Sequence, residues 1–218
     1  MSKLSYSNPP REGAPWRVGI LIFDEVEVLD FCGPFEVFAT TRFLDVNGER
    51  TDKIAFSVKL ISQTDSVVEC RGGLKVIPDF GFANSPDFDI LVVPGGWGTR
   101  KEVDNPILVK WLKFQSEKAQ LMTSVCTGSF LLAKTGILDG FEVTTHWASL
   151  ERLQRAFPKV KTIANKRFVI TGNGKIVSSA GISSGIDMAL YLVSKLVGQE
   201  IALNTANNME YRGNFLDL

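Results

Sequence analysis

Apolar runs rich in β-branched residues alternate with segments of helical periodicity along most of the chain. The run Val18–Phe23 is continuously apolar instead of alternating with polar residues, and Asp89–Val93 and Leu121–Val125 have a similar character. Continuous apolar runs are typical of parallel strands that helices cover on both faces. The pattern therefore predicts an α/β fold with a mostly parallel sheet flanked by helices on both faces.

Turn-forming residues and helix-start signals divide the chain further. The expected strands are Val18–Phe23, Ile54–Ile61, Asp89–Val93 and Leu121–Val125. Glycine-containing turns predict two hairpins, Val67–Cys70 with Leu74–Ile77 and Phe168–Ile170 with Lys175–Ser178. The expected helices are Gly33–Phe43, Asn105–Lys118, a helix from Thr127, Ser183–Val197 and Glu200–Tyr211. Residues 1–16 contain prolines and no periodicity, which predicts a flexible tail before a single domain at residues 17–218.

The charge balance excludes several classes of partner. The chain has 24 Lys and Arg against 24 Asp and Glu in 218 residues, and it has no basic stretch, which argues against nucleic-acid binding. The charge-poor stretch Ala119–Ala133 is too short and too polar to span a membrane. The polar, proline-containing N-terminus is unlike a signal peptide. We therefore expect a cytoplasmic protein with a small-molecule substrate and no membrane partner.

The cysteine and histidine count argues against a metal site. Cys32, Cys70 and Cys126 are far apart in sequence, no C-x-x-C occurs, and His146 is the only histidine. This set does not complete a usual zinc site, and an odd number of cysteines without an export signal predicts free thiols. Each cysteine taken alone is best read as a small buried apolar residue, so the surrounding sequence must identify a reactive one.

Cys126 has the most informative surroundings of the three. It follows the strand run Leu121–Val125 and precedes Thr127, Gly128 and a helical pattern, which predicts a sharp strand-to-helix elbow. Such an elbow exposes a nucleophile at the top of a sheet, and a helix N-terminus there favours a thiolate. The sequence therefore predicts that Cys126 is a nucleophile and the most reactive of the three thiols.

Asp30 is a second candidate, with two alternatives left open. It stands between apolar residues and the sequence Phe31-Cys32-Gly33-Pro34. Asp is a common helix N-cap, so its role could be structural. An apolar setting or a nearby thiolate could instead keep the carboxyl group protonated and let it serve as a general acid.

Two further features could belong to the same site. The turn Pro94–Gly98 follows a central strand, and it could form an oxyanion hole or simply end the strand. No G-x-G-x-x-G or Walker motif is present, so no nucleotide cofactor is expected. His146 would have to supply any histidine chemistry, although a lone histidine is often structural. A Ser–His–Asp triad is poorly supported because no G-x-S-x-G motif occurs.

Five segments together resemble the ThiJ/PfpI superfamily, whose members have the class I glutamine amidotransferase-like, flavodoxin-like α/β fold. The Cys-Thr-Gly run followed by Thr-Thr-His-Trp is similar to the branch that contains isocyanide hydratases and the N-terminal domains of AraC-type regulators. The resemblance covers roughly residues 17–211. The segments are Leu29–Phe38, Val92–Gly98, Thr123–Gly140, Val143–Leu153 and Ala180–Leu190.

The resemblance to isocyanide hydratases implies roles for individual residues. Cys126 would attack the isocyanide carbon to give a thioimidate, Asp30 would handle the proton, and Thr127 would stand beside the nucleophile. The product would be an N-substituted formamide. The implied substrate-binding residues are Gly95, Gly96, Trp97, His146 and Ile182.

The same resemblance leaves competing functions. Family proteases have His directly after the nucleophile, where this chain has Thr127, so peptidase activity is not expected. An isocyanide hydratase, which is a lyase, is the first hypothesis. A ligand- or oxidant-sensing domain without turnover is the second, and small-aldehyde detoxification is the third. The resemblance also implies a homodimer.

Overall fold

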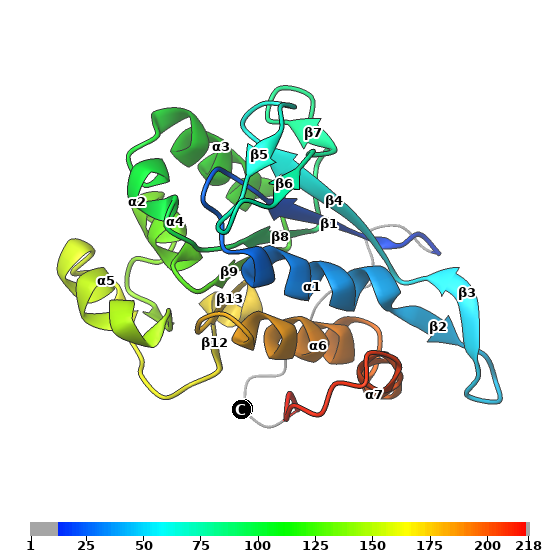
Figure 1. The fold of residues 1–218 in the computed structure, drawn as a ribbon. Helices are drawn as coiled ribbons and strands as arrows, with labels where there is room; N and C mark the ends of the chain where they lie inside the picture. The colour runs from blue at the N-terminus through cyan, green and yellow to red at the C-terminus, as the bar shows by residue number, and fades with distance from the viewer. Residues whose placement is uncertain (1–12, 217–218) are drawn as a thin grey trace.

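The computed structural model describes residues 13–216 and is built around a seven-stranded sheet (Figure 1). Its strands are β1 (Trp16–Leu21), β4 (Phe56–Ser62), β7 (Phe80–Gly81), β8 (Ile90–Val93), β9 (Leu121–Val125), β12 (Phe168–Thr171) and β13 (Ile176–Ser179). Their order across the sheet is β12-β13-β9-β8-β1-β4-β7. Neighbouring strands are parallel except β12, which pairs antiparallel with β13.

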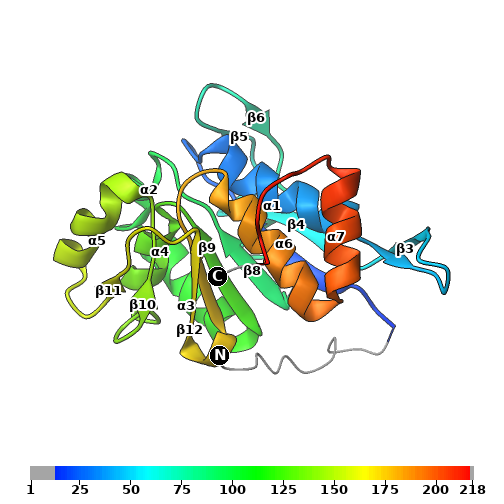
Figure 2. The same ribbon diagram turned by 90° about the horizontal axis from the view of Figure 1, so that it is seen from below.

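Helices cover both faces of this sheet, as the sequence predicts. The helices are α1 (Val28–Thr40), α2 (Thr99–Glu102), α3 (Pro106–Lys118), α4 (Gly128–Lys134), α5 (Leu150–Ala156), α6 (Ser184–Leu196) and α7 (Gln199–Asn208). Figure 2 shows α1, α6 and α7 on one face, and α3 and α4 on the other, with α2 and α5 beside each other at the edge. Every residue of β8 and β9 is buried between the two layers, which explains why these runs are continuously apolar.

Shorter elements surround the main sheet. Two-stranded pairs are formed by β2 (Arg42–Leu44) with β3 (Arg50–Ile54), β5 (Val68–Glu69) with β6 (Lys75–Val76), and β10 (Glu142–Val143) with β11 (Lys161–Thr162). Two 3-10 turns are η1 (Trp147–Ser149) and η2 (Gly172–Gly174). The β5–β6 and β12–β13 pairs confirm the two predicted hairpins. Within residues 13–216, no helix is long and apolar enough to cross a membrane.

The start of α1 differs from the sequence prediction. The helix begins at Val28 instead of Gly33, and Pro34 lies inside it instead of in its first turn. The missing Pro34 N–H costs one intrahelical bond, but Pro34 is buried where α1 packs against α6. Phe43, expected on the face of this helix, belongs to β2. Most of the predicted tail, residues 1–12, lies outside the described residues, and Trp16 already belongs to β1.

Candidate active site

Cys126 lies in the predicted elbow between β9 and α4. Its backbone has a φ of 54°, in the left-handed region that residues other than glycine adopt only when the surroundings enforce it. The Cys126 N–H donates to the Ala180 carbonyl at 3.1 Å, and its own carbonyl accepts from Thr145 Oγ1 at 2.7 Å. These contacts hold the thiol at the carboxyl end of the central strands, where ligands bind in open α/β sheets.

Asp30 reaches the same place from the first turn of α1. The side chain is fully buried, and Oδ2 accepts a hydrogen bond from the Gly95 N–H at 2.9 Å. Oδ1 has no hydrogen-bond partner among the described residues. Glu27, not Asp30, occupies the N-cap position of α1, so the structure does not support the N-cap alternative. Burial, opposed by the Gly95 hydrogen bond, raises the pKa of Asp30 to about 7.

The thiol of Cys126 is more strongly protonated than the sequence predicts. Burial, and then the negative charge of Asp30, raises the pKa of Cys126 to about 12. Hydrogen bonding from Thr127 acts in the opposite direction but is outweighed. The Thr127 N–H at the start of α4 lowers the pKa of Cys126 in the expected direction, but burial and Asp30 outweigh it, so the thiol is protonated in the resting protein. The helix α4 is only seven residues long, and a neighbouring carboxylate acts against its dipole.

Cys126 and Asp30 therefore ionise as a coupled pair. The Asp30 pKa of about 7 and the Cys126 pKa of about 12 leave the pair with a single shared proton over the intervening pH range. When that proton moves from sulfur to the carboxyl group, the thiol becomes a nucleophile and Asp30 becomes an acid beside it. The arrangement can thus attack an electrophile and deliver a proton without an external base.

Backbone N–H groups of the glycine turn after β8 donate hydrogen bonds to Asp30 and to Thr127, the residue that follows the nucleophile. The Gly95 N–H donates to Asp30, and the Gly96 N–H donates to Thr127 Oγ1 at 3.0 Å. Thr127 Oγ1 also lies 3.1 Å from Thr99 Oγ1 at the start of α2. The sequence indicates that N–H groups of this turn could form an oxyanion hole. In the structure, the N–H groups of Gly95 and Gly96 are already hydrogen-bonded within the protein. The turn positions the acid and the residue that follows the nucleophile.

A cavity of about 400 Å³ opens above the thiol. Its lining contains six of the residues that the sequence and the resemblance singled out, namely Gly96, Trp97, Cys126, Thr127, His146 and Ile182. Asp30 and Gly95 are not part of the lining. The residues that sequence reasoning missed are Glu27, Arg100, Ala148, Ser149 and Arg152. The last four come from α2, η1 and α5, elements that the sequence pattern did not predict.

His146 forms part of the cavity wall. Its Nδ1 accepts a hydrogen bond from the Ala148 N–H at 3.3 Å, which caps η1. Gly181 packs against the His146 ring so closely that a Cβ on Gly181 would overlap Cδ2 and lie 3.4 Å from the Cys126 sulfur. The glycine therefore allows the imidazole ring and the thiol to share one side of the cavity. His146 therefore forms part of the cavity wall, where the hydrogen bond from the Ala148 N–H holds its ring.

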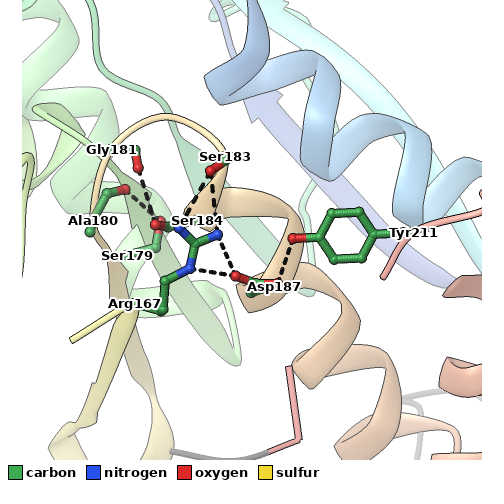
Figure 3. A network of polar contacts seen from close by, with 8 residues as sticks. All are labelled: Arg167, Ser179, Ala180, Gly181, Ser183, Ser184, Asp187 and Tyr211. Atoms are coloured by element: carbon green, nitrogen blue, oxygen red, sulfur yellow. Dashed lines mark hydrogen bonds and ion pairs between the residues drawn. The ribbon is translucent and has the colours of Figure 1, made fainter. Parts of the chain in front are cut away.

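A polar network centred on the buried side chain of Asp187 holds the loop that carries Gly181 and Ile182 (Figure 3). Arg167 pairs with the buried carboxylate of Asp187, which also accepts from the Tyr211 hydroxyl at 2.7 Å. The Arg167 guanidinium lies 3.4 Å from Ser183 Oγ, and the Arg167 carbonyl accepts from the Ala180 N–H at 2.8 Å. The network fixes the start of α6 and, with it, the loop that contributes Ile182 to the cavity lining.

The three cysteines are free thiols, as the sequence predicts. Cys32 is half-buried on α1 and Cys70 is buried at the end of the β5–β6 hairpin. Across residues 13–216, no three His, Cys, Asp or Glu side chains form a group that could hold a metal ion.

Comparison with known proteins agrees with this geometry. The family model described as the DJ-1/PfpI family matches residues 16–195. The chain belongs to the DJ-1/PfpI family. The crystal structure of a ThiJ/PfpI family protein from Pseudomonas syringae has a TM-score of 0.80, covering 92% of this chain and 77% of that chain at 24% identity. That likeness shows a shared fold.

Two curated proteins similar to this chain are of different kinds, one named as an enzyme and the other as a transcriptional regulator. The isonitrile hydratase of Pseudomonas putida is 33% identical over 195 residues, which are 89% of this chain and 78% of the hydratase. The HTH-type transcriptional regulator GbdR of Pseudomonas aeruginosa (strain UCBPP-PA14) is 29% identical over 194 residues. Those residues are 89% of this chain, but the chain spans only half of the regulator's length.

Proposed function

We propose that this DJ-1/PfpI family member is an enzyme that hydrates a small isocyanide to an N-substituted formamide, with Cys126 as nucleophile and Asp30 as proton carrier. The observation that carries the proposal is the coupled Cys126–Asp30 pair, in which the Cys126 thiol lines a cavity of about 400 Å³ and Asp30 is buried beneath it. The identity with the isonitrile hydratase of Pseudomonas putida supports the same reaction.

The proposed reaction proceeds in two balanced steps. In the first, the Cys126 sulfur bonds to the terminal isocyanide carbon while its proton passes through Asp30 to that same carbon. The product is a thioimidate, in which carbon carries one hydrogen, the sulfur and a double bond to nitrogen. In the second step, water adds to this carbon, the nitrogen gains a proton, and the C–S bond breaks. The formamide leaves, and Cys126 recovers its proton.

Other residues of the site have supporting roles in this proposal. Thr127 donates toward the sulfur and links it to the glycine turn. Trp97, His146 and Ile182 shape the cavity around the organic group of the isocyanide. Gly95 acts from behind the cavity by fixing Asp30.

Formamide formation from a panel of alkyl and aryl isocyanides tests the proposal. We expect the wild-type protein to turn over, and Cys126→Ser to lose at least about 10³-fold in kcat, because a serine hydroxyl is a far weaker nucleophile without a strong base. Cys70→Ser, which changes a buried thiol outside the cavity, is the matched control and should keep wild-type kcat. Equal turnover by Cys126→Ser and the wild type would refute the nucleophile.

The similarity to GbdR supports a second candidate, a domain that binds a small molecule without turning it over. The same panel separates the two functions. A sensing domain would bind ligands in calorimetry while producing no formamide, even after long incubation.

We further propose that the protein is a homodimer. Two cavity-lining apolar side chains are exposed, Trp97 (54%) and Ile182 (37%), and so are Trp147 (77%), next to His146, and Leu29 (39%), next to Asp30. Light scattering at micromolar concentration should give twice the mass of one chain, and Trp147→Ser should weaken the association. Ile77→Ser, which changes a side chain of similar exposure (74%) beyond β6, should not. A monomer mass for the wild type would refute the dimer.

A further inference from the structure

Two arginine side chains lie in the cavity wall, and the proposed hydration gives neither of them a role. Arg100 extends from α2, and Arg152 extends from α5. Both line the cavity that contains the Cys126 thiol. Arg100 is exposed and Arg152 is half-buried, so the pair extends from the open side of the cavity inward.

Aromatic rings, not carboxylates, hold these two guanidinium groups. Arg100 lies over the Trp97 ring, 4.0 Å from its centroid, and Arg152 lies over the Phe130 ring at 4.3 Å. Stacking uses the flat face of a guanidinium, while its five N–H donors point outward in the plane of the group. Arg152 uses one of them in a long hydrogen bond of 3.5 Å to Ser149 Oγ. The stacked geometry leaves planar donors available to a ligand.

Neither arginine forms an ion pair with any carboxylate of residues 13–216, which sets them apart from several others in the chain. Arg17, Arg71, Arg155 and Arg167 each pair with an Asp or Glu. Glu27 lines the same cavity, yet it pairs with neither Arg100 nor Arg152. Two cations in one cavity repel each other, and an anion placed between them would relieve that repulsion.

The direction in which the pKa of Arg152 is shifted agrees with two guanidinium groups in one cavity. Burial, and then the positive charge of Arg100, lowers the pKa of Arg152, while the Cys126 sulfur acts in the opposite direction. The field of Arg152 therefore reaches both the other guanidinium and the reacting atom. A substrate anchored at the arginines would lie between them and the thiol.

We propose that Arg100 and Arg152 bind a carboxylate of the substrate, so that the substrate class is a small isocyanide bearing an anionic carboxylate group. This inference rests on the proposed function for the identity of the reacting group, and on the arginine pair for the carboxylate. A planar guanidinium matches a planar carboxylate with two parallel hydrogen bonds. The cavity volume of about 400 Å³ lies within the usual range for small-molecule sites, so the cavity can hold a small isocyanide that bears a carboxylate.

A matched pair of substrates tests the carboxylate directly. Isocyanoacetate and methyl isocyanoacetate present the same isocyanide, but only the first is anionic. We expect the wild-type kcat/KM for isocyanoacetate to exceed that for the ester by about 10-fold or more, in line with a hydrogen bond to a charged group. The preference should shrink as ionic strength rises, because the anchor is partly exposed. An equal or higher kcat/KM for the ester would overturn the proposal while leaving the hydration itself intact.

Substitutions of the two arginines test whether their side chains bind the substrate carboxylate. Arg100→Gln and Arg152→Gln should each remove most of the wild-type preference and bring the ratio of acid to ester kcat/KM towards 1, mainly through the KM for the acid. Arg155→Gln is the matched control, because Arg155 lies on the same helix but pairs with Glu151 outside the cavity. It should leave the ratio unchanged. If both cavity variants keep the wild-type ratio, the arginines do not form the anchor.

A binding measurement separates this inference from the proposed function. N-formylglycine and its methyl ester can be titrated into Cys126→Ser by calorimetry, where no turnover is needed. Tighter binding of N-formylglycine, lost in the Arg152→Gln background, would support the anchor even if no isocyanide is hydrated. Equal binding of acid and ester would overturn it, even if isocyanides are hydrated.

Discussion

Replacing Asp30 with asparagine is expected to lower kcat for isocyanide hydration by about 10²–10⁴-fold, the usual contribution of a positioned acid–base group. Asparagine can keep the contact that Asp30 Oδ2 makes, because its carbonyl oxygen can accept from the Gly95 N–H. It replaces Oδ1, which has no hydrogen-bond partner among the described residues, with an amide group that cannot take up the thiol proton. The variant should fold normally and fail to cycle a proton.

Alkylation of Cys126 by iodoacetamide should remain and become faster at a given pH. The negative charge of Asp30 is one of the causes that raise the pKa of Cys126, and asparagine removes that charge. Thermal melts must show a folded variant, and peptide mapping must assign the alkylated thiol to Cys126. Near wild-type turnover in Asp30→Asn would remove Asp30 from the mechanism.

The pH dependence of wild-type activity follows from the ionisation of Asp30 and Cys126. Below the Asp30 pKa of about 7, both groups are protonated, so no base is present to receive the thiol proton. Activity should therefore rise with pH through about 7. Glu27→Gln provides an internal check. The charge of Glu27 raises the pKa of Asp30, so its removal should move this rise to lower pH without abolishing turnover.

The elbow could be predicted from sequence because its signals are local. A buried strand, a cysteine and a glycine-started helix follow one another within a few residues, and the structure shows that arrangement at Cys126. The parallel sheet was predictable for a related reason, since strands covered on both faces must be apolar throughout.

The ionisation of the site could not be predicted in this way. The pKa of Cys126 depends on Asp30, 96 positions earlier in the sequence, and on burial that only the packed fold defines. The same holds for the start of α1. The sequence marks Pro34 as a first-turn residue, but packing against α6 allows it inside the helix, so tertiary contacts override a local signal.

The cavity arginines were missed because their elements are short. The helices α2 and α5 have four and seven residues, too few for a periodic apolar pattern to emerge. The β2–β3 pair was missed because its strands are half-buried or exposed and so carry no continuous apolar run. An Asp45 side chain that accepts from the Asn47 and Glu49 N–H groups organises its turn instead.

Replacing Gly128 with alanine is expected to destabilise the protein by about 3 kcal/mol, at the upper end of the usual cost of overpacking. Gly128 begins α4 directly after the elbow, and a Cβ there would overlap the Val93 carbonyl oxygen and lie 2.8 Å from the Pro94 carbonyl oxygen. Both obstacles are backbone atoms, and β8 is held between β1 and β9 by parallel pairing. Neither neighbour can move aside as a flexible side chain could.

The loss should appear as a fall of about 6–12 °C in Tm for a chain of this size. Gly136→Ala is the matched control, because Gly136 has a φ of 84° and nothing within 4 Å of its added Cβ. Its cost should be only the ~1 kcal/mol of a left-handed alanine. Because α4 can relieve the clash only by shifting away from β8, Gly128→Ala should also displace Cys126 from Asp30 and reduce turnover in the folded fraction. Equal melting temperatures for the two variants would show that α4 does not require the close approach that sets the elbow.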